Sequence, residues 1–224
     1  KVKDSNPVFR LTKDITGMGI YGAVLDNTAL IETDGFRLFD WELRNITLQN
    51  ISQKTLDITA GSSNVSAQRL FVNGSGDIGV VIRSGHSDME IIGGEIINEN
   101  HQYRETQQLY HGIEIETGDE VTLRSFKVHG FSGLALNPMC EVNLKGFTSE
   151  RNGAGIYFHE PSTMRDCQVN WLRAVSGDSY AYRVAKSLEA NNSGCQLDEN
   201  GALGVFVLEE GATVTINGGD YQFK

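Results

Sequence analysis

One short phrase recurs along this chain of 224 residues at a nearly constant spacing. The phrase consists of a small residue, an apolar residue, any residue, another apolar residue and any residue. Successive copies are about 22 residues apart, and a constant interval of this size is typical of stacked repeat proteins, in which each repeat covers the next. The copies begin at Gly35, Thr55, Gly79, Gly112, Gly133, Gly155, Ala181 and Gly204.

Two further short segments follow the phrase in each repeat. After Gly112 they are 121–123 and 126–128, and the corner between them is Arg124-Ser125. Apolar residues alternate with polar ones, which indicates β-strands, and short corners rich in Gly, Asn and Ser favour a left-handed backbone. No segment has sustained helical periodicity. We therefore predict an all-β, right-handed parallel β-helix of about eight coils with three short strands each, over residues 35–224.

Residues 1–34 fit this pattern less well. Residues 8–11 resemble one more strand, whereas residues 17–22 are rich in glycine and resemble a loop. We expect either an irregular N-terminal segment or an irregular first coil.

Composition limits the partners and cofactors. The net charge of −10 is spread along the chain, which argues against nucleic acid and anionic membranes but not against glycans. No run of about 18 apolar residues is present, so we expect no membrane span. Cys140, Cys167 and Cys195 are widely spaced, and we expect buried free thiols rather than disulfides or a metal site. No cofactor motif is present, and we expect none.

The coil phrase over residues 35–222 resembles that of the pectate-lyase-like β-helix superfamily. That superfamily includes polysaccharide lyases, glycoside hydrolases, uronate epimerases and bacteriophage tailspikes, so one scaffold supports several functions. The acidic composition and a start without a visible signal segment are most similar to the tailspikes. The resemblance implies an extracellular or virion-tail location, a homotrimer, and binding and often cleavage of a bacterial surface polysaccharide, either capsule or O-antigen.

Strand alternation predicts which side chains face outward. Ile113 and Ile115 are expected to point into the coil, and Glu114 and Glu116 away from it. Stacking the phrases gives two outward columns. The first contains Arg37, Asp57, Val81, Glu114, Ala135, Tyr157, Arg183 and Phe206. The second contains Phe39, Thr59, Arg83, Glu116, Asn137, His159, Ala185 and Leu208.

Glu114 and Glu116 are the predicted catalytic carboxylates. Their Cα atoms should lie about 6.7 Å apart on one face, which puts the carboxyl groups within the range that glycosidases use. Repulsion between them should raise the pKa of one toward that of a general acid. His159 is the third predicted catalytic residue, as a base or as a group that orients a carboxylate. Ordinary solvated surface is the alternative for all three.

The predicted substrate-binding residues surround these three. Arg83 and Arg183 could bind a uronate or sialate carboxylate, Tyr157 could stack on a sugar, and Asn137 lies in the same patch. The two longest intervals precede Gly112 and Ala181, and long loops on a rigid scaffold often carry binding residues. The candidate substrate walls in and beside these loops are Tyr103, Tyr110, His111 and Trp171.

Three functions follow from this interpretation. The leading one is a tailspike-type domain that binds and hydrolyses a bacterial surface polysaccharide. The second is a polysaccharide lyase or uronate epimerase, in which His159 or Tyr157 removes a proton from the sugar. The third is a non-catalytic receptor-binding or structural segment of a phage appendage or adhesin.

Overall fold

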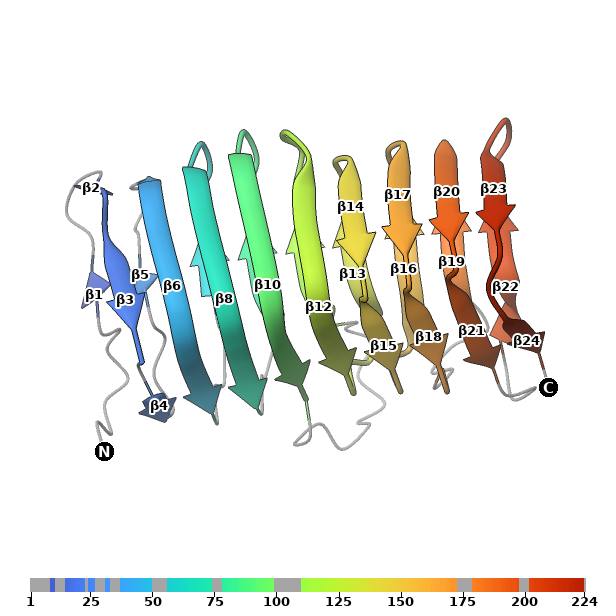
Figure 1. Ribbon diagram of the computed structural model, residues 1–224, viewed down its shortest axis with the longest axis horizontal. Coiled ribbons are helices and arrows are strands. Elements are labelled where there is room, and N and C mark those ends of the chain that lie inside the picture. Colours follow the sequence, from blue (N-terminus) through green and yellow to red (C-terminus); the bar gives the residue numbers. More distant parts are fainter. Residues whose placement is uncertain are drawn as a thin grey trace.

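The protein, described here by a computed structural model, is a rod of stacked β-coils (Figure 1). The structure describes residues 9–10, 15–22, 24–26, 31–32, 37–49, 56–73, 78–98, 110–172, 179–197 and 202–223. Within these ranges every regular element is a strand, and the strands pair in parallel. The chain is therefore an all-β parallel β-solenoid, as predicted. It makes about six turns, fewer than the eight suggested by the repeated phrase.

One side of the rod is a seven-stranded sheet, here called the anchor sheet, which is built from the repeated phrase. Seven of the eight copies contribute to it. Its strands are β7 (Leu56–Ile58), β9 (Val80–Ile82), β11 (Ile113–Ile115), β13 (Leu134–Pro138), β16 (Ala154–Phe158), β19 (Ser179–Val184) and β22 (Ala202–Leu208). The copy at Gly35 was assigned wrongly, because Leu38 and Phe39 begin a long strand of the other sheet. Arg37 and Phe39 therefore do not belong to the predicted outward columns.

A fifteen-stranded sheet, here called the long sheet, forms the remaining sides. In the earlier coils each strand runs through the corner without a break. These strands are β6 (Leu38–Gln49), β8 (Ser63–Asn73), β10 (Ser87–Ile97) and β12 (Val121–His129). In the later coils the corner separates two strands. The pairs are β14 (Val142–Lys145) with β15 (Thr148–Glu150), β17 (Ser162–Arg165) with β18 (Gln168–Asn170), β20 (Ser187–Asn191) with β21 (Gly194–Leu197), and β23 (Thr213–Asn217) with β24 (Tyr221–Phe223).

The corner of the long sheet is a column of residues with left-handed backbone. Ser125 has φ of 51° and Asp166 has φ of 53°, and between them in the stack Gly146 has φ of 63°. Asn192 continues the column with φ of 46°. Asn, Asp and Gly tolerate this conformation best, which explains the composition of the predicted corners. The bend divides each coil of the long sheet into two arms, so that a coil has three sides.

The interior is filled by the inward positions of all three sides. Ile113 is 0% exposed and Ile115 is 1% exposed, as the alternation predicts. Trp41 and Tyr182 are among the largest fully buried side chains. The predicted buried free thiols are confirmed for all three cysteines, and burial raises the pKa of Cys140 to about 12.

The described N-terminal strands stack at the first end of the rod. β1 (Phe9–Arg10) pairs with β5 (Ile31–Glu32). β2 (Ile15–Thr16), β3 (Gly19–Tyr21) and β4 (Val24–Asp26) pair with β6. The prediction of a loop at residues 17–22 was therefore wrong for β3, which continues the long sheet.

Candidate functional site

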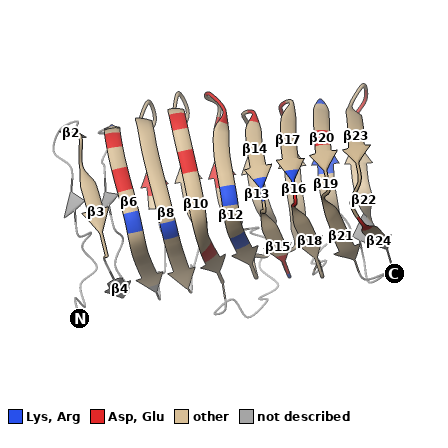
Figure 2. Cartoon of the chain, in the orientation of Figure 1, with Lys and Arg blue, Asp and Glu red and all other residues tan. Residues whose placement is uncertain are grey.

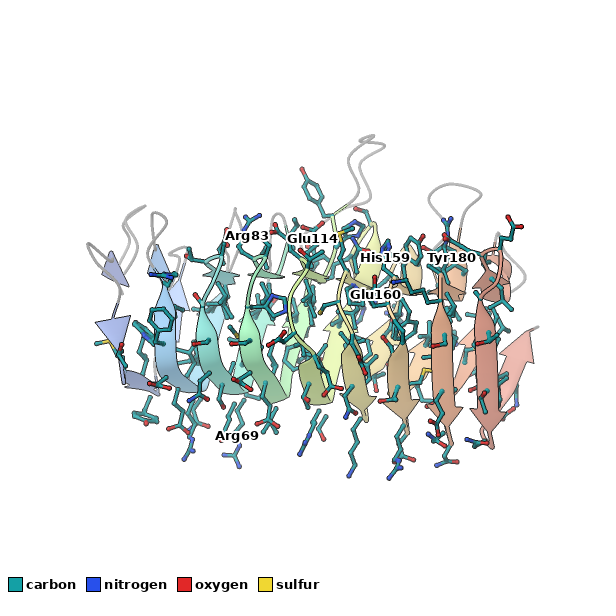
Figure 3. The ribbon with its side chains drawn as sticks, turned by 90° about the horizontal axis from the view of Figure 1, so that it is seen from above. Arg69, Arg83, Glu114, His159, Glu160 and Tyr180 are labelled. Atoms are coloured by element: carbon teal, nitrogen blue, oxygen red, sulfur yellow. The ribbon has the colours of Figure 1, made fainter. Side chains whose placement is uncertain are left out.

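The outward side of the anchor sheet, here called the outer anchor face, carries the predicted acidic pair. The side chains of Glu114 and Glu116 are 30% and 38% exposed, whereas their apolar neighbours in β11 are buried. Arg83, Glu114 and His159 lie along one long side of the rod, and Arg69 lies on the opposite side (Figure 3). The predicted orientation of Glu114, Glu116 and His159 is thus observed.

Pairing between strands defines the two outward columns of this face. Glu114 pairs with Val81 on one side and with Asn137 on the other, and Tyr157 pairs with Arg183. The first column contains Asp57, Val81, Glu114, Asn137, Tyr157, Arg183 and Val207. The second column, defined by backbone hydrogen bonds at the strand ends, contains Thr59, Arg83, Glu116, Met139, His159, Ala185 and Glu209.

The prediction placed two coils incorrectly. In β13 it was shifted by two residues, since Asn137 takes the position that we assigned to Ala135, beside Glu114. Met139 therefore lies between Glu116 and His159 in the second column. In β22 the prediction was shifted by one residue, because Tyr182 pairs with Phe206. Phe206 and Leu208 consequently occupy inward positions, and Val207 and Glu209 face outward.

Arg83 holds two carboxylates from neighbouring coils. Its Nε and Nη2 donate to the carboxylate of Asp57 at 2.9 and 2.7 Å, and its Nη1 donates to Glu116 Oε1 at 2.9 Å. The hydrogen bonds to Asp57 are the main cause of a raised Arg83 pKa. Arg83 is therefore a fully paired cation, which weakens its predicted role as the binder of a substrate carboxylate.

The environment of Glu116 keeps its carboxyl group ionised. Partial burial favours the neutral form, but hydrogen bonds from Arg83 and from the Ser84 N–H, together with the Arg83 charge, lower the pKa below its usual value. We expected repulsion from Glu114 to raise the pKa of one of the two carboxyl groups. The lowered pKa shows that Glu116 is not the carboxyl group whose pKa is raised.

Glu114 faces a histidine from the preceding turn. The Leu134 N–H donates to Nδ1 of His111 at 2.8 Å, so the proton of the neutral ring is on Nε2. That nitrogen lies 3.8 Å from Glu114 Oε1. Burial lowers the pKa of His111 and favours this neutral form. The pair gives Glu114 a neutral donor as its neighbour, in contrast to the cation beside Glu116.

Asn137, His159 and Tyr157 form a continuous contact across β13 and β16. Nε2 of His159 lies 3.1 Å from Oδ1 of Asn137, and the His159 ring is tilted against the Tyr157 ring with centroids 3.7 Å apart. Burial is the largest influence on His159 and lowers its pKa. The ring is therefore neutral near pH 7, donates from Nε2 and carries a lone pair on Nδ1. This lone pair suits a sugar hydroxyl as donor.

Tyr157 also joins the next two coils through Glu209. Its hydroxyl donates to Glu209 Oε1, and Arg183 donates to the same oxygen from Nε at 3.1 Å. Arg183 Nη2 lies 2.9 Å from this oxygen in an ion pair. The Arg183 guanidinium lies over the Tyr157 ring, 4.6 Å from its centroid. Burial and the Glu209 hydrogen bond raise the pKa of Tyr157, and this opposes the predicted use of Tyr157 as a proton-removing base.

A small apolar cluster borders these polar groups. Leu134, Ala154 and Tyr180 are buried together apart from the main core, and the outward-facing Tyr157 and Val207 pack against them. Tyr180 lies on the same long side of the rod as His159 (Figure 3). The polar strip of the outer anchor face thus adjoins a buried apolar cluster, of which the partly buried Tyr157 and Val207 are the outermost part.

The predicted substrate walls are only partly near this site. His111 adjoins Glu114, whereas Tyr110 packs against the main core. Trp171 is 42% exposed at the end of the second arm of the long sheet, where its backbone N–H donates to the Gln196 carbonyl oxygen. Tyr103 lies outside the described residues.

Glu209 is the site residue that we missed. It was hidden by the one-residue error in β22, which placed Leu208 where Glu209 lies. Asp57 was recognised as an outward residue but not as a partner of Arg83. Asp57 in the first column and Arg83 in the second are diagonal neighbours on adjacent coils, and their opposite charges were the signal that could have identified this pair.

Comparison of the chain with family models, with curated proteins and with solved structures finds no match in any of the three. The class that the fold defines is the parallel β-solenoid. In the part of the chain that the structure describes, no helix has the length and apolar character required to cross a membrane. Those same residues contain no cluster of three or more His, Cys, Asp or Glu side chains placed to bind a metal ion.

Proposed function

We propose that the outer anchor face binds a bacterial surface polysaccharide, as tailspike-type proteins of the superfamily that the chain resembles do. The observation that carries the proposal is the hydrogen-bonded strip of Asn137, His159, Tyr157, Arg183 and Glu209 across four successive strand positions. These side chains hold one another in place before any ligand arrives, so little conformational entropy is lost on binding.

The chemistry of the strip suits a sugar. Asn137 and the lone pair of His159 Nδ1 offer hydrogen-bond partners to hydroxyl groups, and the cluster of Leu134, Ala154 and Tyr180 adjoins them. Polar groups in fixed positions beside apolar surface are typical of small-molecule and sugar sites. A linear glycan along the rod axis would contact several coils at once.

The charge of the face favours a neutral glycan over an acidic one. Arg83 and Arg183 are its two cations, and each is paired with a carboxylate. Asp57, Glu116 and Glu209 accept these pairs, and Glu114 adds a further carboxylate. An acidic sugar would have to compete with the carboxylates that already pair with these two cations. We therefore propose a neutral glycan for this face in preference to the uronate or sialate that the sequence suggested.

Hydrolysis is a second candidate function, favoured by the unequal surroundings of Glu114 and Glu116. Glycosidases pair an ionised carboxylate with a protonated one. Arg83 and the Ser84 N–H hold Glu116 ionised, which suits a base or a nucleophile. Glu114 faces Nε2 of the neutral His111 at 3.8 Å, which suits the acid that protonates the leaving oxygen.

The test uses capsule and O-antigen preparations, with binding and release of reducing ends measured separately. The double variant Asn137→Ala with His159→Ala should lose binding by about tenfold or more, since two fixed hydrogen-bonding groups are removed. Asn73→Ala, an exposed asparagine on the long sheet, is the matched control and should bind normally. Unchanged binding by the double variant would contradict the proposal.

The hydrolysis candidate is tested on the same preparations. Glu114→Gln and Glu116→Gln should each abolish new reducing ends while binding persists, and the exposed Glu141→Gln should change neither. Binding without reducing ends in the unaltered protein would leave a non-catalytic receptor-binding domain. An unsaturated uronate product would point to a lyase with His159 as the base.

A further inference from the structure

A row of three cations crosses the long sheet on consecutive coils. Arg124 at the end of the first arm of β12 pairs directly with Lys145 of β14, and Lys145 pairs directly with Arg165 of β17. All three side chains are exposed. Blue segments lie at nearly the same level on β12, β14 and β17 (Figure 2). This set of three residues, here called the basic row, does not belong to the anchor sheet.

The fold itself does not require these charges. Neighbouring strands lie about 4.8 Å apart, and like charges directly opposite one another destabilise a sheet. The same column contains Gln68 and Ile92 on the two preceding coils, and Asn191 and Asn217 on the two that follow. Neutral residues are thus compatible with the position. Arg44 precedes Gln68 in the same column, so three adjacent coils carry a cation only from Arg124 to Arg165.

Two of the three cations in the basic row lack the carboxylate partners that neutralise the cations of the outer anchor face. Neither Lys145 nor Arg165 forms an ion pair with any carboxylate in the described ranges. Arg124 Nε lies 3.6 Å from Glu90 Oε1, at the edge of ion-pair distance. The nearby acid Asp166 accepts a hydrogen bond from Asn192 at 2.7 Å instead.

The surface around the basic row is a shallow groove with polar walls. Its lining includes all three cations, the exposed Asn143 and Thr163 in the adjacent column, and one carboxylate, Glu189, which accepts a hydrogen bond from Asn191 at 3.1 Å. On the other side the corner residues Ser125 and Gly146 are small, and the third corner residue is the exposed Asp166. A polymer could therefore lie along the row without meeting a large side chain at the corner.

We propose that the basic row binds a linear anionic polysaccharide lying along the rod axis, with acidic groups facing successive coils. The coil spacing of about 4.8 Å is comparable to the length of one sugar unit. Successive acidic groups of such a polymer can therefore lie opposite the cations of successive coils. The chain carries a net charge of −10, which repels a polyanion elsewhere and favours this groove. The site is separate from the outer anchor face and does not depend on the function proposed there.

Three polymers test the proposal with the 224-residue chain: polygalacturonate, dextran sulfate and uncharged dextran. At least one of the two charged polymers should bind, dextran should not, and salt should weaken the binding. A preference for polygalacturonate or for dextran sulfate identifies carboxylate or sulfate ester as the recognised group. Equal binding of uncharged dextran, or no binding of either charged polymer, would overturn the proposal.

Two triple variants with the same change in net charge locate the site. Arg124→Gln, Lys145→Gln and Arg165→Gln together should weaken binding of the charged polymer about tenfold or more. The control Arg37→Gln, Arg151→Gln and Lys186→Gln should change it less than about twofold, because these exposed cations lie outside the column of the basic row. If the first triple variant does not fold, Lys145→Gln alone should still weaken binding about threefold.

Three outcomes would contradict the basic row as the site. Equal losses in the two triple variants would show that net charge alone is responsible. Loss of binding in Asn137→Ala with His159→Ala, but not in the basic-row variant, would place the polymer on the outer anchor face. Tighter binding of a single-stranded oligonucleotide than of either charged polymer would indicate nucleic acid instead.

Discussion

The guanidinium of Arg183 lies over the ring of Tyr157, 4.6 Å from the ring centroid, and both residues donate to the same oxygen of Glu209. Three coils are joined by this contact. Because the carboxylate accepts from both groups, none of the three side chains can move without breaking a charge-assisted hydrogen bond. The outer anchor face is therefore organised in advance at the position where we propose that a glycan binds.

This arrangement predicts an unusually weak acid at Tyr157. Burial and the hydrogen bond to Glu209 both raise the pKa of Tyr157. Glu209→Gln removes the charge and should shift the titration of Tyr157 toward its ordinary range. The measurement is an ultraviolet difference titration of each protein against its Tyr157→Phe counterpart. The control Glu210→Gln changes an exposed neighbouring carboxylate and should leave the midpoint where it was; an equal shift in both would contradict the assignment.

The pairing of Arg83 with Glu116 predicts a dependence of stability on pH. The pKa of Glu116 in the folded protein is below its usual value, so the carboxylate stabilises the fold above its unfolded-state pKa. That contribution is lost as the pH falls through the lowered folded-state value. The difference in urea midpoint between the unaltered protein and Glu116→Gln should therefore shrink from pH 7 toward pH 3.

Arg83→Met provides the complementary measurement for this pair. Without the guanidinium, Glu116 and Asp57 lose their shared cation, and the pKa of Glu116 should rise. An NMR titration that follows the chemical shift of the Glu116 carboxyl carbon measures this pKa directly. A Glu116 midpoint that is the same with and without Arg83 would show that the ion pair does not form in solution.

A third prediction concerns the close approach of strands at Gly155. A Cβ atom on Gly155 would lie 2.0 Å from the carbonyl oxygen of Ala181, so β16 and β19 must separate to accept it. We expect Gly155→Ala to lower the free energy of unfolding by about 3 kcal/mol or more. Gly211→Ala meets no atom within 4 Å but has φ of +80°, and it should cost only about 1–2 kcal/mol. Chemical denaturation measures both, and the reverse order would contradict the packing described.

Much of the fold could be predicted because each coil repeats the same requirements. The apolar residues at Ile113 and Ile115, and their equivalents, fill the same inward positions on successive coils. Small or Asn-like residues recur at the corner because the backbone there is left-handed. Both signals are local in sequence, so they can be recognised without any knowledge of neighbouring coils. The phrase at Gly35 was assigned to the wrong sheet because alternation alone does not indicate which sheet a strand joins.

The columns of the site were harder to predict because they depend on register between coils. A shift of two residues preserves the alternation of inward and outward side chains, so the sequence did not reveal that Asn137 lies beside Glu114. Between β19 and β22 a register shift at Ser179 and Tyr180 moved the alternation by one residue, which places Glu209 rather than Leu208 in the second outward column. Hydrogen bonds between strands decide both cases, and they connect residues more than twenty positions apart.

Hydroxyl-radical footprinting with a bound O-antigen or capsule polysaccharide tests the central proposal most directly. Met139 is 46% exposed in the outward column between Glu116 and His159, so its oxidation reports on occupation of the outer anchor face. Tyr21 is 59% exposed at the first end of the rod and serves as the internal control. The account predicts that a polysaccharide which binds will protect Met139 and His159 and leave Tyr21 reactive. Binding that leaves Met139 and His159 as reactive as in the unbound protein would contradict it.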